Sequence, residues 1–248
     1  MDKTKSPENS AEMPFLDHLE ELRWRLIKIV ASIILLSVIA FSFSDYLLEI
    51  LLYPTRSLQD KMNIQVLKVQ TIFMIKLELS LLSGAVISLP YIFYQLWAFL
   101  APGLLENERK YAIPVIFFAT LSFIIGAMFA YFIIIPLALD FFMNMAPASI
   151  ENNIALDFYI GFLLRLIIVF GIVFELPMVS LFLTKLGILT PEFLKKYRRY
   201  AIVIFFILAA ILTPPDPTTQ VLLAIPLLLL YEVTIWVSYL FAKKKDDN

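Results

Sequence analysis

Two long stretches of this chain carry no charged residue, which restricts the solvent in which they can fold. Residues 79–105 and 111–139 contain no Asp, Glu, Lys or Arg. An α-helix rises 1.5 Å per residue, so about 20 apolar residues cross the ~30 Å hydrocarbon core of a bilayer. We therefore expect each stretch to form a transmembrane helix.

The composition of the whole chain also indicates a membrane protein. Of its 248 residues, 60% are hydrophobic and 17% are charged, whereas a soluble domain has roughly 25% charged residues. The length fits one compact bundle and leaves no room for a large soluble domain. The net charge of −1 provides no overall field that would attract nucleic acid.

Hydropathy predicts an all-α membrane protein with six spans, preceded by a polar segment (residues 1–25) and followed by a short tail (residues 243–248). The N-terminal segment lacks the apolar core of a cleavable signal peptide, so the first span is expected to act as the insertion signal. Residues 45–68 and 140–157 are interpreted as loops. The six spans are expected at about 26–44, 74–99, 111–139, 158–184, 197–212 and 218–241.

The fifth and sixth spans are expected to be short. Only 13 apolar residues, 200–212, precede a proline-rich turn, and 13 residues rise about 20 Å. Pro226 and Glu232 interrupt the apolar segment that follows. One interpretation is a re-entrant hairpin. The other, adopted here, is two short spans that place basic residues at the interface and thin the local bilayer.

Lysine and arginine residues predict the orientation of the chain. With the N-terminus in the cytoplasm, the cytoplasmic segments hold 15 of the 20 Lys and Arg residues, and the opposite loops hold 3. Positively charged residues are concentrated on the cytoplasmic side of membrane proteins. We therefore expect a multi-pass protein of a bacterial-type cytoplasmic (inner) membrane, with both termini in the cytoplasm.

Residue types that support common catalytic or metal chemistry are scarce. The chain has no cysteine, which excludes disulfides, thiolate metal sites and a cysteine nucleophile. His18 is the only histidine, so one chain cannot form a two-histidine metal motif. No phosphate-binding loop, G-x-S-x-G or H-E-x-x-H motif is present. We expect no catalytic residue, no metal site, no cofactor and no enzymatic activity.

One acidic residue, Glu175, lies inside the fourth span. A charged side chain at mid-membrane costs a few kcal/mol, so such residues are usually functional or paired. Pro177 cannot donate to the carbonyl group four residues earlier, which predicts a bend. Glu175 either packs as a protonated group against another span or presents a polar contact in a groove. Arg165, ten residues earlier, either extends to the interface or pairs with Asp157 or Asp216.

Acidic residues also occur on two predicted cytoplasmic segments. Glu20 and Glu21 precede the first span, and Glu106 and Glu108 lie in the loop after the second. Such residues are commonly no more than solvated ends. If they form a site, carboxylates on separate segments could each bind a guanidinium group through two hydrogen bonds, which would discriminate arginine from lysine.

Six segments in order resemble those of one known family. Residues 13–23, MPFLDHLEELR, are similar to its H-L-x-E-L-R opening, and residues 89–104 to its P-x-x-x-Y-Q-x-W-x-F-x-x-P-x-L motif. Glu108-Arg109 follows at the family's spacing. The remaining segments are FAYF (129–132), FGIVFELP (170–177) and residues 212–226, which include TPPD. Together they resemble TatC, the multispanning subunit of the twin-arginine protein translocase, over residues 13 to about 242.

This resemblance implies a six-span, glove-shaped receptor that binds the twin-arginine signal peptides of folded cargo proteins. It also implies a complex with the single-span subunits TatA and TatB and with further TatC copies. Transport of folded proteins would then be driven by the proton-motive force. The loop at residues 56–70 does not closely resemble the family, and we transfer no role to its second half.

The resemblance also assigns roles to individual residues. The positions implied in signal-peptide binding are Glu21, Arg23, Phe99 and Glu108. The positions implied in contact with a partner span inside the membrane are Glu175 and Gln220. The positions implied at the outer face are Pro54, Tyr131 and Asp216.

Two other classes of membrane protein fit the sequence less well. A secondary transporter is expected to show internal halves with corresponding broken helices, and none is visible. An intramembrane enzyme needs a nucleophile with a base, or metal ligands, at membrane depth. Only Arg165 and Glu175 are ionisable there.

Overall fold

The structure is a computed structural model that describes residues 15–58, 62–105, 109–145, 152–213 and 216–242. Helices dominate these ranges, as hydropathy predicts. Five helical segments are long and apolar enough to cross a membrane, and they begin at Asp17, Thr71, Ala112, Leu156 and Pro217.

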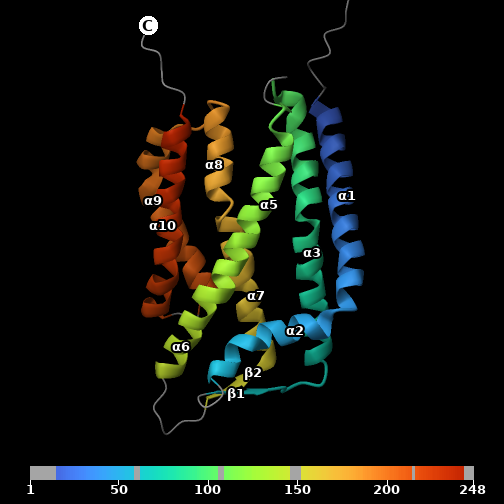
Figure 1. Cartoon of the computed structure of the whole chain (residues 1–248), viewed down its shortest axis with the longest axis vertical. Coiled ribbons are helices and arrows are strands. Elements are labelled where there is room, and N and C mark those ends of the chain that lie inside the picture. The colour runs from blue at the N-terminus through green and yellow to red at the C-terminus, as the bar shows by residue number, and fades with distance from the viewer. Residues whose placement is uncertain (1–14, 59–61, 106–108, 146–151, 214–215, 243–248) are drawn as a thin grey trace, which may run out of the picture.

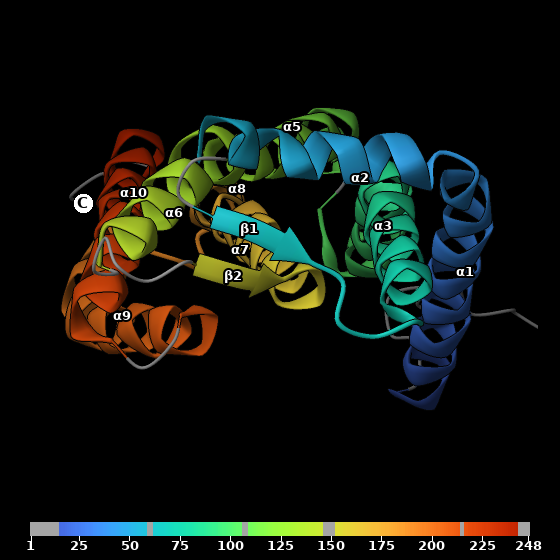
Figure 2. The same cartoon turned by 90° about the horizontal axis from the view of Figure 1, so that it is seen from below.

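The first two long helices, α1 (Phe15–Phe41) and α3 (Thr71–Leu100), lie side by side along their length (Figures 1 and 2). Gly84 permits this close packing, because a Cβ atom there would collide with the backbone of Ser37. α1 begins well before the predicted span, so the charged residues between Phe15 and residue 26 are helical. Only 6% of the most apolar stretch of α1 is buried, which leaves most of this helix to lipid or to partners.

The third long segment is one nearly continuous helix with a widened turn. α5 (Ala112–Phe129) leads through a π-helical turn, η3 (Ala130–Ile134), into α6 (Ile135–Met145). Pro136, near the start of α6, has no amide hydrogen for the carbonyl group four residues earlier. A π-turn just before the proline is one way in which a helix accommodates that loss.

The fourth apolar segment is broken where the sequence predicts a bend. α7 (Leu156–Val173) ends before Glu175, and α8 (Leu176–Lys185) begins after it, with Pro177 in its first turn. Close contact between α7 and α5 depends on Gly126, because a Cβ atom there would lie 2.6 Å from the carbonyl oxygen of Phe170. The break therefore follows a tightly packed part of α7.

The last two helices, α9 (Pro191–Leu212) and α10 (Pro217–Phe241), pack against each other. Each begins with a proline preceded by a capping residue: Thr190 accepts a hydrogen bond from Phe193, and Asp216 accepts one from Thr219. α10 coincides with the predicted sixth span, 218–241, but it is not short for a bilayer, since its 25 residues rise about 37 Å. Only α9 keeps a short apolar length.

Short elements cover the end of the molecule opposite the termini, where the sequence predicts loops. α2 (Ser44–Leu52) lies across this end and leads into a 3-10 helix, η1 (Tyr53–Leu58) (Figure 1). β1 (Met62–Gln65) pairs in parallel with β2 (Asn152–Ala155), with Met62 opposite Asn152 (Figure 2). Strands of four residues give little periodicity, and their partners are far apart in sequence, so hydropathy cannot predict this pair.

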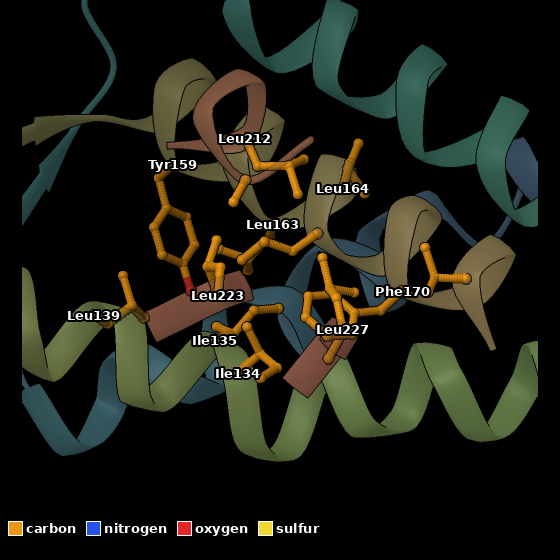
Figure 3. Close-up of a cluster of buried hydrophobic side chains, with 14 of the residues drawn as sticks. Ile134, Ile135, Leu139, Tyr159, Leu163, Leu164, Phe170, Leu212, Leu223 and Leu227 are labelled. Carbon is orange, nitrogen blue, oxygen red and sulfur yellow. The ribbon is translucent and has the colours of Figure 1, made fainter. Parts of the chain in front are cut away.

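The core lies where η3, α6, α7, α9 and α10 meet. Large apolar side chains from these helices point into one cluster (Figure 3). Members that the figure labels include Ile134, Ile135, Leu139, Leu163, Phe170, Leu212, Leu223 and Leu227. α1 contributes no side chain to this cluster within the part of the chain described, so α3 provides its main attachment.

The helices form an open, curved row and do not close into a bundle. α1 and α3 lie at one end of the row and α9 and α10 at the other, with α7 and α8 between them (Figure 2). The start of α1 and the end of α10 lie at the same end of the molecule (Figure 1). We call this end of the molecule the terminal end. A chain that crosses a membrane an even number of times must have its two termini on the same side.

Candidate functional site

A cluster of polar and aromatic side chains joins α1 to α3 at the terminal end. Oε1 of Glu21 accepts a hydrogen bond from Nε of Arg25 at 2.9 Å and a second one from Nη2 of the same guanidinium group. Nη1 of Arg25 donates to Oε1 of Gln95 on α3 at 3.0 Å. The carboxylate and the guanidinium group are each 21% exposed, and Gln95 is buried.

Two aromatic rings complete this cluster. The ring of His18 stacks on that of Phe99, with centroids 4.2 Å apart and planes 12° apart. Nδ1 of His18 lies 3.8 Å from Oε2 of Glu21. Oε2 is buried and has no hydrogen-bond partner among the described residues. The carboxylate therefore has one oxygen engaged and one buried oxygen able to accept a donor.

Helical spacing explains why these five residues meet. Positions 18, 21 and 25 lie on one face of α1, and positions 95 and 99 lie one turn apart on α3. We call His18, Glu21, Arg25, Gln95 and Phe99 the α1–α3 cluster. The sequence pointed to Glu21 and Phe99 but not to the contact of Arg25 with Gln95. The Glu21–Arg25 spacing is the signal that could have indicated Arg25.

The other two residues implied in signal-peptide binding lie outside this cluster. Arg23 is on α1, and its side chain is exposed. Glu108 lies outside the described residues, so its predicted proximity to Glu21 stays a prediction. Nearby, Arg109 donates through Nε to the carbonyl oxygen of Leu104 at 3.3 Å.

Glu175 lies in the break between α7 and α8. Both of its carboxylate oxygens are buried and have no hydrogen-bond partner among the described residues, and the same is true of the Ser180 hydroxyl group on α8. Leaving polar atoms unpaired in an apolar environment costs several kcal/mol in hydrocarbon and about 1–3 kcal/mol in protein interiors. These groups are therefore suited to accept or exchange a hydrogen bond with another polar group.

Gln220 and Arg165 have other partners. Nε2 of Gln220 donates to the carbonyl oxygen of Phe206 at 2.9 Å, which ties α10 to α9. Gln220 makes no hydrogen bond to Glu175, whose carboxylate oxygens have no partner among the described residues. Nε of Arg165 donates to the carbonyl oxygen of Gly161 in its own helix. Of the two alternatives for Arg165, the pairing with Asp157 or Asp216 is not found among the described residues. Asp157 lies 3.6 Å from Nζ of Lys68, and Asp216 caps α10.

The residues implied at the outer face lie at the end of the molecule opposite the termini, where they contact or adjoin α2 and α10. The Tyr131 hydroxyl group, in η3, donates to the carbonyl oxygen of Ile50 at 2.6 Å. Tyr159, which the sequence did not single out, donates to that of Leu51 at 2.9 Å. Pro54 is half-buried in η1, directly after α2. A tyrosine in an apolar helix usually finds a hydrogen-bond partner, which is the signal that could have indicated Tyr159.

Asp216 caps α10 at the same end of the molecule. Its Oδ2 accepts a hydrogen bond from the Thr219 amide at 2.9 Å, and its carbonyl oxygen accepts one from the Thr219 hydroxyl at 3.2 Å. The donated amide hydrogen lowers the pKa of the Asp216 carboxyl group, because it stabilises the ionised form. The negative charge also faces the positive end of the α10 dipole.

Comparison with known proteins decides the family. The family model described as Sec-independent protein translocase protein (TatC) matches residues 17–226. The chain belongs to the TatC family. The TatC of Aquifex aeolicus is 41% identical over 237 residues, which cover 95% of this chain and 98% of that protein. The TatC of Desulforapulum autotrophicum is 38% identical over 236 residues, covering 95% and 87%.

Solved structures of the TatC family show the same fold. A crystal structure titled as the twin-arginine translocase receptor TatC superimposes with a TM-score of 0.83 at 42% sequence identity, and it covers 90% of this chain and 98% of that one. A second, in DDM, gives the same TM-score and identity. The resemblance read from the sequence is thereby confirmed: this is a multi-pass, helical membrane protein of the twin-arginine translocation system.

Proposed function

We propose that this chain is the receptor subunit that binds twin-arginine signal peptides and exports folded proteins across the cytoplasmic membrane, using the proton-motive force. One observation carries the proposal: the Glu21 carboxylate is held half-buried in the α1–α3 cluster, and its buried Oε2 accepts no hydrogen bond from the described residues. This cluster lies at the terminal end, and the distribution of lysine and arginine predicts that this end faces the cytoplasm.

The chemistry of the cluster suits a guanidinium group better than an ammonium group. A guanidinium group is planar and presents parallel N–H donors that match the two oxygens of a carboxylate, whereas lysine offers a point charge. The stacked rings of His18 and Phe99 lie beside the carboxylate, and guanidinium groups stack favourably on aromatic faces. In the proposal, Glu108 supplies the second carboxylate for the second arginine and Arg23 contacts the peptide.

Peptide binding tests the proposal. A synthetic signal peptide with adjacent arginines should bind the purified chain in lipid nanodiscs more tightly than the same peptide with two lysines. Glu21→Gln should weaken arginine-peptide binding about tenfold or more, since a charged hydrogen-bonded pair is lost. Glu20→Gln, an exposed neighbour, is the matched control and should leave the affinity unchanged. Equal binding of both peptides to the wild-type chain would overturn the assignment.

Export in cells tests the same site. The double substitution Glu21→Ala and Glu108→Ala should abolish export of a twin-arginine substrate while Sec-dependent export continues. Adding an uncoupler should stop export of that substrate by the wild-type protein, because the proposal assigns the driving force to the proton gradient. Normal export by the double variant would exclude a role for these acids.

The proposal also includes partners inside the membrane. Glu175 offers carboxylate oxygens without a hydrogen-bond partner within the described residues, and we assign it the contact with a polar residue on a TatA or TatB span, with Gln220 as a second contact on α10. Such hydrogen bonds average ~0.6 kcal/mol and reach about 1–2 kcal/mol, which suits reversible association.

A photo-crosslinker at position 175 should capture a partner span or a second copy of this chain. The same probe at exposed Ile172 is the control, and equal capture from both positions would remove support for a specific contact.

Orientation is open to a direct test because the chain has no native cysteine. Single cysteines at Lys3 or Lys245 should react with a membrane-impermeant thiol reagent only from the cytoplasmic side. A cysteine at exposed Val66, in the segment that follows β1, should react only from the opposite side. Labelling of Lys3 and Val66 variants from one side would contradict the proposed topology.

A further inference from the structure

We propose that Arg25 occupies the Glu21 carboxylate as an internal guanidinium group when no signal peptide is bound, and that an incoming arginine must displace it. Arg25 would then act as a latch that sets how tightly a cationic peptide must bind. This inference rests on the proposed function of Glu21 as the carboxylate that receives a peptide arginine. It adds a residue to which neither the sequence nor the family resemblance assigned a role.

The geometry of the Glu21–Arg25 pair is that of a displaceable occupant. Both donors of Arg25, Nε and Nη2, converge on Oε1 of Glu21, and Oε2 accepts no hydrogen bond from the described residues. The strongest arginine–carboxylate pairs are bidentate and engage both oxygens through parallel N–H donors. A peptide arginine that engaged both oxygens would therefore be held better than Arg25, and its bond to the buried Oε2 would replace no hydrogen bond from the described residues.

Gln95 distinguishes this pair from an ordinary charge pair on a helix surface. Pairs four residues apart on one helix are common, but they are usually exposed and weak. Here Nη1 of Arg25 also donates to Oε1 of Gln95, a residue of α3 that is only 4% exposed. The Gln95 contact holds the guanidinium group between two helices. It also gives Arg25 an acceptor that it can keep when it leaves Glu21.

The latch is expected to lower the affinity for cationic peptides without changing the selectivity between arginine and lysine. When the binding-competent state is only partly populated, the apparent affinity falls by that fraction. Arginine and lysine peptides must both displace the same side chain, so the latch weakens both by the same factor. It does not change their ratio, which the pairing geometry of Glu21 sets. Its effect is to keep weakly bound cationic segments below the threshold for binding.

The experiment measures peptide affinity for the full-length chain in lipid nanodiscs, with one synthetic signal peptide carrying Arg-Arg and a matched one carrying Lys-Lys. Arg25→Gln should lower both dissociation constants about tenfold and leave their ratio unchanged. Arg25→Lys, which keeps the charge but loses the planar group, should lower them about threefold. Lys28→Gln removes one positive charge one turn along α1 from an exposed side chain and should change neither constant appreciably.

Each result either supports or overturns the latch. Arg25→Gln can also fold and yet bind each peptide no more tightly than the wild type does. In that case Arg25 positions Glu21 and does not compete with the peptide. If Lys28→Gln tightens binding as much as Arg25→Gln, the effect is general electrostatics and the latch is wrong. If Arg25→Gln does not fold, the Arg25→Lys comparison decides. Failure of the proposed function itself has a different signature, because wild-type protein would then not prefer the Arg-Arg peptide and Glu21→Gln would have no effect.

Discussion

Tyr131 and Tyr159 approach the same turn of α2 from two different helices. Their hydroxyl groups donate to consecutive carbonyl oxygens, those of Ile50 and Leu51. The last carbonyl groups of a helix commonly take donors from outside the helix, and side chains often supply them. The carbonyl oxygen of Ile50 also accepts a hydrogen bond from the Tyr53 amide, so Tyr131 is its second donor. These two bonds fasten α2, which lies across the end opposite the termini, to the helices that run the length of the molecule (Figure 1).

Replacing Tyr159 with Phe should destabilise the protein. Tyr159 is 3% exposed, so the variant leaves the carbonyl group of Leu51 buried without its donor. We expect a loss of about 1–3 kcal/mol in the free energy of unfolding, measured by denaturant unfolding in detergent micelles. Tyr46→Phe on α2 is the control, because its side chain is 70% exposed. Equal destabilisation by the two substitutions would show that the buried hydrogen bond does not contribute measurably to the free energy of unfolding.

Asp216 should make stability depend on pH in the acidic range. Its pKa is lower than the ordinary value of 3.8, chiefly because the Thr219 amide donates to the carboxylate. A carboxyl group with a lowered pKa stabilises the fold above its unfolded pKa, and the contribution is lost as the pH falls through the folded pKa. Thermal unfolding of the wild type should therefore shift downward below about pH 4. Asp216→Asn also caps a helix but does not titrate. Its unfolding temperature should show less of this shift, and parallel pH curves for the two proteins would contradict the expectation.

At the scale of whole elements, the α5–α7 contact depends on two glycines that face each other's helices. A Cβ atom at Gly126 would lie 2.6 Å from the carbonyl oxygen of Phe170, and one at Gly171 would lie 2.6 Å from the ring of Phe123. Backbone cannot move aside as a side chain can, so Gly126 is the more restrictive position. Small residues allow close approach of this kind between membrane helices.

Gly126→Ala should therefore separate α5 from α7 at a cost of about 1–3 kcal/mol, the usual range for overpacking. Gly161→Ala, on α7, is the matched control, because its Cβ atom would make an ordinary contact of 3.6 Å with Arg165. Thermal unfolding in one detergent measures both variants. The packing argument requires that Gly126→Ala be clearly the less stable of the two, and a result in the other order would refute it.

The sequence predicts the long helices well because the bilayer leaves a long apolar stretch almost no alternative. It also predicts the break near Glu175, since Pro177 removes a specific hydrogen bond. It does not predict α2 or the parallel strand pair, because these depend on contacts distant in sequence. The contact of Arg25 with Gln95 is missed for the same reason, since it requires the register of α1 against α3.

At the scale of the molecule, the open row of helices leaves large surfaces for other molecules. α1 is held mainly by α3, and most of its apolar stretch is exposed. Glu175 provides buried carboxylate oxygens with no hydrogen-bond partner in the described chain, in a segment that is apolar apart from Arg165 and Glu175. An open shape with unpartnered polar groups is suited to binding other helices, which agrees with a translocase subunit better than with a closed bundle that only spans the bilayer.

The short apolar part of α9 predicts that the bilayer beside this helix is thinned. Its apolar part, residues 200–212, rises about 20 Å, which is less than the ~30 Å of an average hydrocarbon core. The exposed basic residues before it cannot easily shift into lipid, because Arg198 is bonded to Glu232 of α10 at 2.7 Å and Lys195 lies 5.6 Å from the ring of Tyr239. A short apolar span is accommodated by thinning of the adjacent bilayer, which carries a cost that rises with the mismatch.

Thermal unfolding in nanodiscs made from monounsaturated phosphatidylcholines should therefore show greater stability with short acyl chains than with long ones. If stability rises steadily with acyl-chain length, the basic turn of α9 is not held at the interface and the thinning argument is wrong.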